Sequence, residues 1–595
     1  MRKSRSLSPE GVYIISVNPR RSLAFTLLLA SAVLVSGIGA TSQTPSLPTL
    51  RSEDSGRWEA LVPSTDHLGL SPDGSVLAYR IDRSNWEDEL RVARLSDGRT
   101  LVVPYGRNPE YSADGRWLRY DIGHSPAEET QLKNDHRPVR EGLGLVELST
   151  FAETRFSDVG DSDFSSDGAY IAIERYVPRP ADSRGGGDRR ANSDESPRLY
   201  VRSLRSGPGN GTELAFDNVR QFEWQPDHGH LLAMNMGGDA QGGARVQLLN
   251  PSAAPASATT VLDDTPASFS ELAWRANGSD LAYLRSHSNR AHAGVAFDVI
   301  AVRGIGTAAP TTRVYDATRD PGFPADTRVV DFRRPSWSAD GRVIFVGIAA
   351  PQPAASDRGT GANVRIWHWR DIEVMPYQAE HIEADGRRNR LAAVNIDDGT
   401  LIVLAPSFDA RAHPIPGTSL AWVADWSAYA MDRTLGRPAA DLSLVDTRTG
   451  QRTLFATKVD DSEVHVRPDG GALVFLRDAH LWSLNTRTRA LTDLSAASGA
   501  SLIDTGSDTT GPHKPTFGIG GWTRGGAVLA YDRDDIWRLA IDGSASENLT
   551  DGAATRTRYR VAQLADPVDD RVVDDTRPST SNCSANAPRS TATRD

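Results

Sequence analysis

The chain has 595 residues, a formal net charge of −11, 51 glycines, 35 prolines, 13 tryptophans and one cysteine, Cys583. This length allows a large hydrophobic core. The negative charge argues against nucleic acid as a partner, because phosphates require a basic face. A lone cysteine cannot form an internal disulfide, so packing must hold the fold together.

The N-terminal residues predict an export signal. Two arginines precede an apolar run over residues 23–35, and small residues follow as far as Ala40. This order predicts a signal peptide over residues 1–40 and a linker over residues 41–59. The arginine pair resembles a twin-arginine signal, although an ordinary secretory signal also has a basic region. An uncleaved membrane anchor is the alternative. We expect an exported protein, periplasmic or extracellular, without a stable membrane span after signal cleavage.

One short pattern then recurs eight times: a polar turn ending in Asp-Gly or a close variant, an apolar strand and a further strand. The turns lie at residues 71–74, 112–115, 165–168, 225–229, 275–278, 338–341, 467–470 and 523–526. Asp bonds nearby amides and Gly accepts a positive φ, so each turn reverses the chain tightly. This period predicts an all-β fold, a seven- or eight-bladed β-propeller of four-stranded antiparallel blades over residues 60–552.

Aromatic residues precede several of these turns, at the end of the expected inner strand. We expect them to pack between blades: Tyr111, Phe164, Trp224, Trp274 and Trp337. The interval from Asp340 to Asp469 is too long for one blade, so it should contain a degenerate blade with strands in residues 391–404 and 422–449. Closure of the ring would remove exposed sheet edges.

Polar segments interrupt the expected blades. Residues 178–197 and 236–243 are rich in glycine and polar side chains, which indicates loops. Residues 125–135 predict a short helix. Its acidic pair, Glu128 and Glu129, is expected on a solvated helix face, with cation binding as the alternative.

The sequence offers no catalytic serine in a recognisable setting. An α/β-hydrolase requires a Gly-x-Ser-x-Gly elbow, whose small residues let a strained turn expose the hydroxyl. The nearest segment, residues 417–421 around Ser419, ends in Ala421 and lacks the strand-to-helix context. We therefore predict no catalytic residue.

Candidate metal ligands are also poorly spaced. The histidines are scattered without the His-Glu-x-x-His spacing, and the aspartates before Gly168 depart from the EF-hand register, while the turn already explains Asp167. These candidates are His287, His292, His368, His381, Asp161, Asp163, Asp167 and the lone Cys583. We predict no metal-binding or cofactor-binding residue.

Two segments carry a family resemblance. Residues 364–371 (VRIWHWRD), with Pro376 and Gln378, resemble a propeller segment of exported bacterial serine peptidases of the prolyl oligopeptidase family, of the acylaminoacyl-peptidase and dipeptidyl-peptidase kind. Residues 521–552 are similar to the last blade before the hydrolase domain of those proteins. Alternation along residues 364–371 would place Trp367 and Trp369 on one face of a strand, packed between blades.

The resemblance spans roughly residues 60–578 and implies an α/β-hydrolase domain, with Ser, Asp and His, after the last blade. Residues 553–578 resemble the start of the connection toward such a domain. Residues 579–595 then change composition abruptly and predict a disordered tail. We expect the catalytic domain to be missing and the chain to be a substrate-gating propeller of a peptidase acting on peptides, non-catalytic as it stands.

The expected partners are peptides or a protein at the propeller mouth. Two other functions remain open from the sequence. A TolB-like periplasmic propeller would bind a protein partner. A propeller glycosidase or lyase would require carboxylates that converge near the axis, which a sequence does not display.

Overall fold

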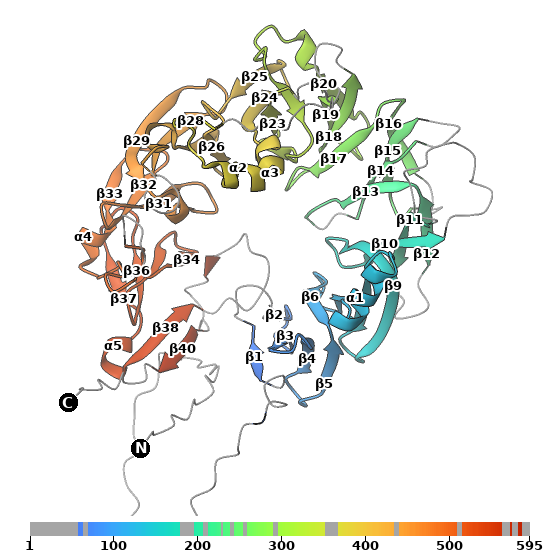
Figure 1. Cartoon of the computed structure of the whole chain (residues 1–595), viewed down its shortest axis with the longest axis horizontal. Coiled ribbons are helices and arrows are strands. Elements are labelled where there is room, and N and C mark those ends of the chain that lie inside the picture. The colour runs from blue at the N-terminus through green and yellow to red at the C-terminus, as the bar shows by residue number, and fades with distance from the viewer. Residues whose placement is uncertain are drawn as a thin grey trace, which may run out of the picture.

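The computed structural model describes residues 51, 58–62, 69–178, 195–205, 212–227, 230–238, 243–253, 259–288, 295–351, 367–432, 439–508, 514–561, 572–573 and 581–585. Their strands form successive four-stranded antiparallel units around a central space, with the first strand of each unit on the inner side (Figure 1). The predicted all-β propeller fold is confirmed. The expected signal peptide and most of the linker lie outside the described residues.

The first three blades are continuous in sequence. Blade 1 contains β1 (Glu59–Leu61), β2 (Gly69–Leu70), β3 (Val76–Arg83), β4 (Glu89–Arg94) and β5 (Thr100–Pro104). Blade 2 contains β6 (Gly106–Tyr111), β7 (Trp117–Ile122), β8 (Glu141–Glu147) and the first half of β9 (Ala152–Phe164). The second half of β9 begins blade 3, which continues with β10 (Tyr170–Pro178), β11 (Glu195–Ser203) and β12 (Glu213–Asp217).

The next three blades repeat the arrangement. Blade 4 contains β13 (Val219–Trp224), β14 (Leu232–Met236), β15 (Ala244–Leu249) and β16 (Thr259–Thr265). Blade 5 contains β17 (Phe269–Trp274), β18 (Leu281–Ser288), β19 (Val295–Arg303) and β20 (Thr311–Tyr315). Blade 6 contains β21 (Arg328–Val330), β22 (Ser336–Trp337), β23 (Val343–Ala349), β24 (Arg390–Asn395) and β25 (Thr400–Val403).

Three further blades complete the series. Blade 7 contains β26 (Ala410–Pro414), β27 (Leu420–Asp425), β28 (Ala440–Asp446) and β29 (Arg452–Val459). Blade 8 contains β30 (His465–Val466), β31 (Ala472–Arg477), β32 (His480–Asn485) and β33 (Leu491–Asp493). Blade 9 contains β34 (Ile519–Thr523), β35 (Val528–Tyr531), β36 (Ile536–Leu539) and β37 (Ser546–Asn548).

The described residues therefore form nine blades, one more than the upper number predicted. Each of the eight recognised turns joins the first two strands of a blade, and blade 7 is the additional one. Its turn at residues 415–418 contains Pro416-Gly417 in place of Asp-Gly, with Gly417 at φ 67°. Strands were expected in residues 391–404, but these residues complete blade 6 instead of a separate blade.

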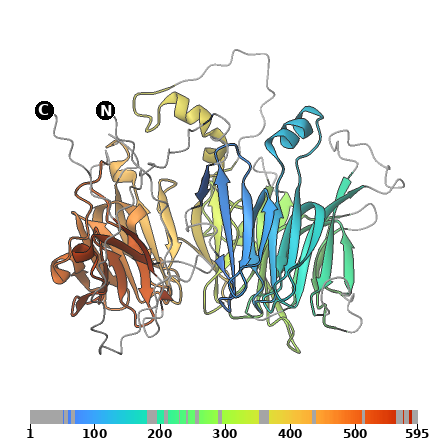
Figure 2. The same cartoon turned by 90° about the horizontal axis from the view of Figure 1, so that it is seen from below.

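Helices occupy the connections between second and third strands. Helix α1 (Pro126–Asn134) lies between β7 and β8, and α2 (Met375–Glu380) and α3 (Ile382–Gly386) lie between β23 and β24. These connections leave the end of the blade opposite to the Asp-Gly turns, so α1, α2 and α3 protrude from one face of the molecule (Figure 2). Two short helices, α4 (Leu494–Ser498) and α5 (Gly552–Thr555), follow blades 8 and 9. Among the described residues, no helix is both long and apolar enough to cross a membrane.

Serine side chains fix several of the Asp-Gly turns. Ser112 is fully buried, its Oγ donates to Asp114 Oδ1 at 2.6 Å, and it accepts from the Trp117 N–H at 3.0 Å. The same two bonds recur in blades 1, 3 and 6 at Ser71, Ser165 and Ser338. The serine thus joins the turn carboxylate to the start of the second strand.

The aromatic residues before the turns connect neighbouring blades, as predicted. The indole N–H of Trp224 donates to the carbonyl of Asp163 at 3.1 Å, Trp274 donates to Glu223 at 3.0 Å, and Trp337 donates to Ala273 at 3.0 Å. The Tyr111 hydroxyl reaches the Gly69 carbonyl at 3.2 Å in the same way. Each acceptor directly precedes the corresponding position in the previous blade, so the bonds form a ladder from blade 6 back to blade 3 and from blade 2 to blade 1. Phe164 of blade 3 has no donor and joins blade 2 by apolar packing.

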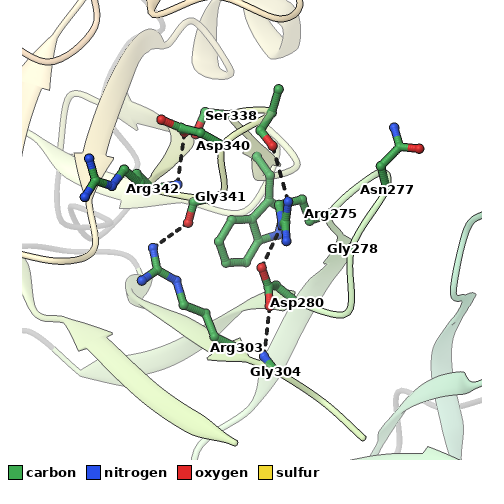
Figure 3. A network of polar contacts seen from close by, with 12 residues as sticks. Arg275, Asn277, Gly278, Asp280, Arg303, Gly304, Ser338, Asp340, Gly341 and Arg342 are labelled. Carbon is green, nitrogen blue, oxygen red and sulfur yellow. Dashed lines mark hydrogen bonds and ion pairs between the residues drawn. The ribbon is translucent and has the colours of Figure 1, made fainter. Parts of the chain in front are cut away.

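A polar network adds to this connection between blades 5 and 6 (Figure 3). Arg275 Nε lies 2.7 Å from Asp280 Oδ2, and Arg275 Nη1 donates to the Ala339 carbonyl of blade 6 at 3.2 Å. Arg303 donates to the Gly341 carbonyl. Asp280 is buried, so its pairing with Arg275 satisfies a carboxylate that would otherwise be costly to desolvate.

Hydrophobic clusters join each blade to the next, from blades 1 and 2 through blades 8 and 9. The structure differs from the prediction that the ring closes between the last blade and the first. In the described part of the chain, no strand of blade 9 pairs with a strand of blade 1, and no cluster joins these two blades. The inner strand of blade 9 pairs instead with β39 (Val572–Val573), in parallel.

The C-terminal residues also depart from the expected disordered tail. Within residues 579–595, Ser581–Ala585 form β40, which pairs antiparallel with β38 (Thr557–Val561). Strand edges carry unpaired N–H and C=O groups that attract further strands, which explains the addition of β39 and β40 beside blade 9. Within residues 553–578, the described positions lie in or next to α5, β38 and β39, and the connection toward a hydrolase domain stays a prediction. The remaining residues of the tail lie outside the described residues.

Candidate binding site at the propeller axis

Carboxylates occupy the inner strands of four consecutive blades. They are Glu110 on β6, Asp163 on β9, Glu223 on β13 and Glu271 on β17, and we call them the axial carboxylates. The first three directly precede an aromatic residue of the ladder. These strands belong to four successive blades (Figure 1), so residues more than 150 positions apart in sequence lie on neighbouring inner strands in one sector of the ring.

Charge coupling shows that these groups lie near one another. Burial raises the pKa of Asp163 to about 7, and the charges of Glu110 and Glu223 act in the same direction, while Arg119 opposes them. Burial also raises the pKa of Glu271, with Arg334 opposing and Asp331 and Glu223 reinforcing the shift. Carboxylates from different blades thus repel one another, and a cation among them would relieve that repulsion.

Two arginines compensate part of this charge. Arg119 pairs with Glu110 and donates to Ser162 Oγ at 3.2 Å. Arg334 Nη2 lies 2.6 Å from Glu223 Oε1, and the same guanidinium donates to the carbonyl of Leu272. Four carboxylates therefore share two arginines, which leaves the sector negative when Asp163 is ionised.

The inner strands are locally bent at this site. The pairing of β6 with β7 shifts register between Arg107 and Glu110, and Asn108 within the shift has φ 51°. The pairing of β17 with β18 shifts between Ser270 and Ala273, and Glu271 itself has φ 59°. Positive φ is unfavourable for such residues, and β-bulges of this kind redirect side chains next to functional sites.

Blades 6 and 7 contribute basic residues to the same region of the fold. Arg411 lies on the inner strand β26 and Arg333 lies between β21 and β22. Burial lowers the pKa of Arg333, and the charge of Arg411 adds to this effect. The inner strands thus carry an acidic sector on blades 2–5 and a basic sector on blades 6 and 7.

The structure does not assemble a nucleophile around Ser419. This residue lies in the turn of blade 7 and lines a cavity of about 710 Å³ beside Arg467 and Arg487. None of the described residues that line this cavity is a histidine, so the cavity offers no imidazole base to Ser419.

A serine and a histidine that the sequence did not pair meet on the face of the Asp-Gly turns. Ser252 Oγ lies 2.8 Å from His230 Nε2, and His230 Nδ1 lies 3.9 Å from Asp167 Oδ2. The second distance is too long for a hydrogen bond. Ser252 Oγ also donates to Asn250 Oδ1 at 2.7 Å, and the Ser252 N–H donates to the same oxygen. These bonds are those of a turn, and they leave no oriented base for Ser252.

The candidate metal ligands do not assemble. Among the described residues, no group of three or more His, Cys, Asp or Glu side chains could hold a metal ion. Asp161 accepts the Ser162 N–H, Asp167 accepts the Ser165 hydroxyl, and His381 stacks on Tyr377. His287 lies near Asp298, Cys583 lies on β40, and His292 is outside the described residues.

The acidic pair on α1 has structural roles. Glu128 completes a capping box with Ser125, and Glu129 lies 2.5 Å from Lys133 one turn later. Helix α1 buries no residue, which agrees with the predicted solvated helix face.

The prediction for Trp367 and Trp369 was wrong. Both precede α2 outside any strand, and their exposed fractions are 49% and 66%. Residues 364–366 of the same motif lie outside the described residues. The alternating aromatic residues suggested a strand, but in the described part of the chain Trp367 and Trp369 pair with no strand.

No protein-family model matches the chain, and no curated protein matches it. Several solved structures are similar to it. The β-propeller domain of the Trilobed protease from Pyrococcus furiosus, described as having an open velcro topology, is 9% identical with a TM-score of 0.29, over 68% of this chain and 99% of that chain. Pyrococcus horikoshii acylaminoacyl peptidase is 11% identical with a TM-score of 0.30, over 72% of this chain and 57% of that chain.

A structure from a study of two prolyl endopeptidases is 9% identical with a TM-score of 0.33, over 72% of this chain and 55% of that chain. The solved structures similar to this chain thus include the peptidase family that the sequence resembles, and they cover about 70% of it. The chain spans just over half the length of the two peptidase chains.

Proposed function

We propose that this chain is a peptide-binding, substrate-gating propeller of the prolyl oligopeptidase kind, which binds positively charged peptide segments at its axis without cleaving them. The observation that carries this proposal is the meeting of four axial carboxylates with only two arginines. A Lys or Arg side chain, or a free amino terminus, would supply the missing positive charge.

The basic sector adds direction to this binding. A peptide that places its positive group at the axial carboxylates has Arg333 and Arg411 available for a carboxylate elsewhere in its length. Charged groups on both sectors would favour peptides over fully cationic polymers such as polyamines.

A binding titration tests the proposal. A fluorescent decapeptide containing two arginines should bind the wild-type chain at low salt, and Glu223→Gln with Glu271→Gln should weaken binding about ten-fold, because opposite charges at such sites contribute strongly when screening is low. Glu213→Gln on the outer strand β12 is the matched control and should bind as the wild type does. Equal affinity of the axial variant and the wild type would contradict the proposal.

The second candidate is a TolB-like periplasmic propeller that binds a folded protein. The exposed tryptophans before α2 favour it, because exposed apolar side chains often mark protein interfaces. Such a propeller would form a stoichiometric complex with a folded partner and would ignore short peptides. We also propose that the chain acts outside the cytoplasm, which a fusion of residues 1–40 to an export reporter would test.

A further inference from the structure

The connection between β23 and β24 exposes an unusual amount of apolar surface. Between residues 367 and 382, seven large apolar side chains are exposed, and we call them the apolar patch: Trp367, Trp369, Ile372, Val374, Met375, Tyr377 and Ile382. Trp369 is 66% exposed and Ile382 is 70% exposed. Neither α2 nor α3 buries any residue. Contiguous apolar surface of this kind marks a site that another molecule covers.

Helix α1 shows that this composition is not a general property of the face. Both α1 and the α2–α3 segment protrude from the same face of the propeller (Figure 2). The sequence of α1, PAEETQLKN, is polar and is stabilised by its capping box and an ion pair. The α2–α3 segment instead exposes aromatic and aliphatic side chains. Contact with another apolar surface would remove these side chains from water.

The charges around the apolar patch indicate the chemistry of that partner. Five carboxylates lie in or directly after the patch: Asp371, Glu373, Glu380, Glu383 and Asp385. Of the arginines nearby, Arg370 stacks over the Trp369 ring at 4.8 Å, and Arg388 pairs with Asp409 of blade 7. The patch is thus apolar with a mainly acidic border, which complements an apolar segment flanked by basic residues and disfavours an anionic lipid surface.

The length of the α2–α3 segment indicates the size of the ligand that it can hold. Helices α2 and α3 lie on the inner side of blade 6, toward the central space (Figure 1). Together they contain about a dozen residues, or roughly 18 Å of helix. An extended peptide covers that length with about five or six residues.

We propose that the apolar patch binds peptides in which an apolar run of about five or six residues is followed by basic residues, with the run on α2–α3 and the basic residues at the carboxylates of its border. This inference rests on the proposed function and names its substrate class. The two tryptophans supply rigid aromatic surface, and the carboxylates of the border select the basic end.

Two peptides with the same basic end test the proposal. One has the sequence Leu-Phe-Val-Leu-Phe-Arg-Arg, and the other has Ser and Gly in place of the five apolar residues. The variant Trp369→Ser with Ile382→Ser should bind the first peptide about ten-fold or more weakly than the wild type, as expected when anchor residues are removed, and should bind the second unchanged. Leu454→Ser, which removes a similarly exposed apolar side chain on β29, should change neither affinity.

The outcomes separate the two proposals. Unchanged binding of the apolar peptide by the double variant would overturn the apolar patch as its site. If the axial variants still weaken the Ser-Gly peptide, the proposed function would survive that result. If the double variant no longer binds the first peptide, and the axial variants bind both peptides as the wild type does, the result would support the patch and contradict the axial site. Sedimentation of the wild type with neutral phosphatidylcholine vesicles, lost in the double variant, would overturn the peptide in favour of lipid.

Discussion

Blades 1–6 and blades 7 and 8 have the same four-stranded plan, but their inner strands are tied together differently. In blades 2, 4, 5 and 6, an indole or phenol group donates to the preceding blade, and serines fix the turns of blades 1, 2, 3 and 6. In blades 7 and 8, Pro414 and Val466 occupy the aromatic position, and Arg467 occupies the serine position, with its Nε 2.5 Å from Asp469 Oδ1. Other groups tie these later blades: Trp426 Nε1 donates to Asp461 Oδ1 at 3.1 Å, and Ser483 Oγ donates to the Ile541 carbonyl. Polar ties thus recur at one position in the first part of the ring and lie at varied positions in the second.

The largest effect is expected from breaking the ladder. Trp274 is almost fully buried between blades 4 and 5 and donates to Glu223. Trp274→Ala should lower the free energy of unfolding by about 3–5 kcal/mol, because it removes a large buried side chain and its hydrogen bond. Val466→Ala at the corresponding position of blade 8 should cost about 1 kcal/mol. Urea unfolding followed by fluorescence measures both, and equal losses would contradict the contrast between the two regions.

A pH-dependent effect is expected at Asp163. Its pKa of about 7 means that the folded state retains a proton that the unfolded state releases above about pH 4. The contribution of Asp163 to stability is therefore present in full below about pH 4 and is lost as the pH rises through 7. Asp163→Asn should raise the free energy of unfolding by about 2–4 kcal/mol at pH 8 and by less than about 1 kcal/mol at pH 4.5. A gain of the same size at both pH values would show that ionisation of Asp163 is not its cause.

A smaller loss is expected at the turns. Ser112→Ala removes the bond to Asp114 and leaves the buried Trp117 N–H without its acceptor. We expect a loss of about 1–2 kcal/mol. Thr418→Ala, in the turn of blade 7, removes the bond to the Ile415 carbonyl and the bond from the Leu420 N–H, both at a partly exposed site where water can replace them, and should cost less than about 1 kcal/mol. A cost for Thr418→Ala as large as that for Ser112→Ala would contradict a special role of the buried serines.

The sequence revealed much of this fold because the turn chemistry is local. Asp-Gly after a serine dictates the reversal, and eight blades followed from it. Blade 7 was predicted only as a degenerate blade between Asp340 and Asp469, because Pro416-Gly417 turns the chain without an aspartate. The ladder was anticipated only as packing, since the acceptors of Trp224 and Trp274 are backbone carbonyls that no sequence pattern marks.

The candidate site could not be predicted from the sequence, for a different reason. Glu110, Asp163 and Glu223 each precede a ladder residue, which is a recognisable signal, but their proximity depends on how each blade is rotated relative to the next. The exposure of Trp367 and Trp369 was missed because alternating aromatics usually indicate a buried strand. Only the three-dimensional arrangement shows that α2 and α3 bury nothing.

The smallest effect concerns serine reactivity in both regions. Ser252 lies in blade 4 and Ser419 in blade 7, and neither has a base that is oriented by a third group. A fluorophosphonate probe should therefore label neither serine at stoichiometric level, and peptide reporters should remain intact. Mass spectrometry of the treated chain locates any adduct. Full modification of Ser252 that disappears in His230→Ala would establish a catalytic pair that the geometry argues against.

The most direct test of the central claim is to map where a basic peptide binds. Hydrogen exchange of the wild-type chain, with and without a saturating arginine-containing peptide, reports protection strand by strand. Binding at the axial carboxylates predicts slower exchange in the inner strands β6, β9, β13 and β17, with the outer strands β12, β16 and β20 unchanged. Protection confined to the outer strands, or an inner-strand pattern identical with and without the peptide, would contradict a peptide-binding axis.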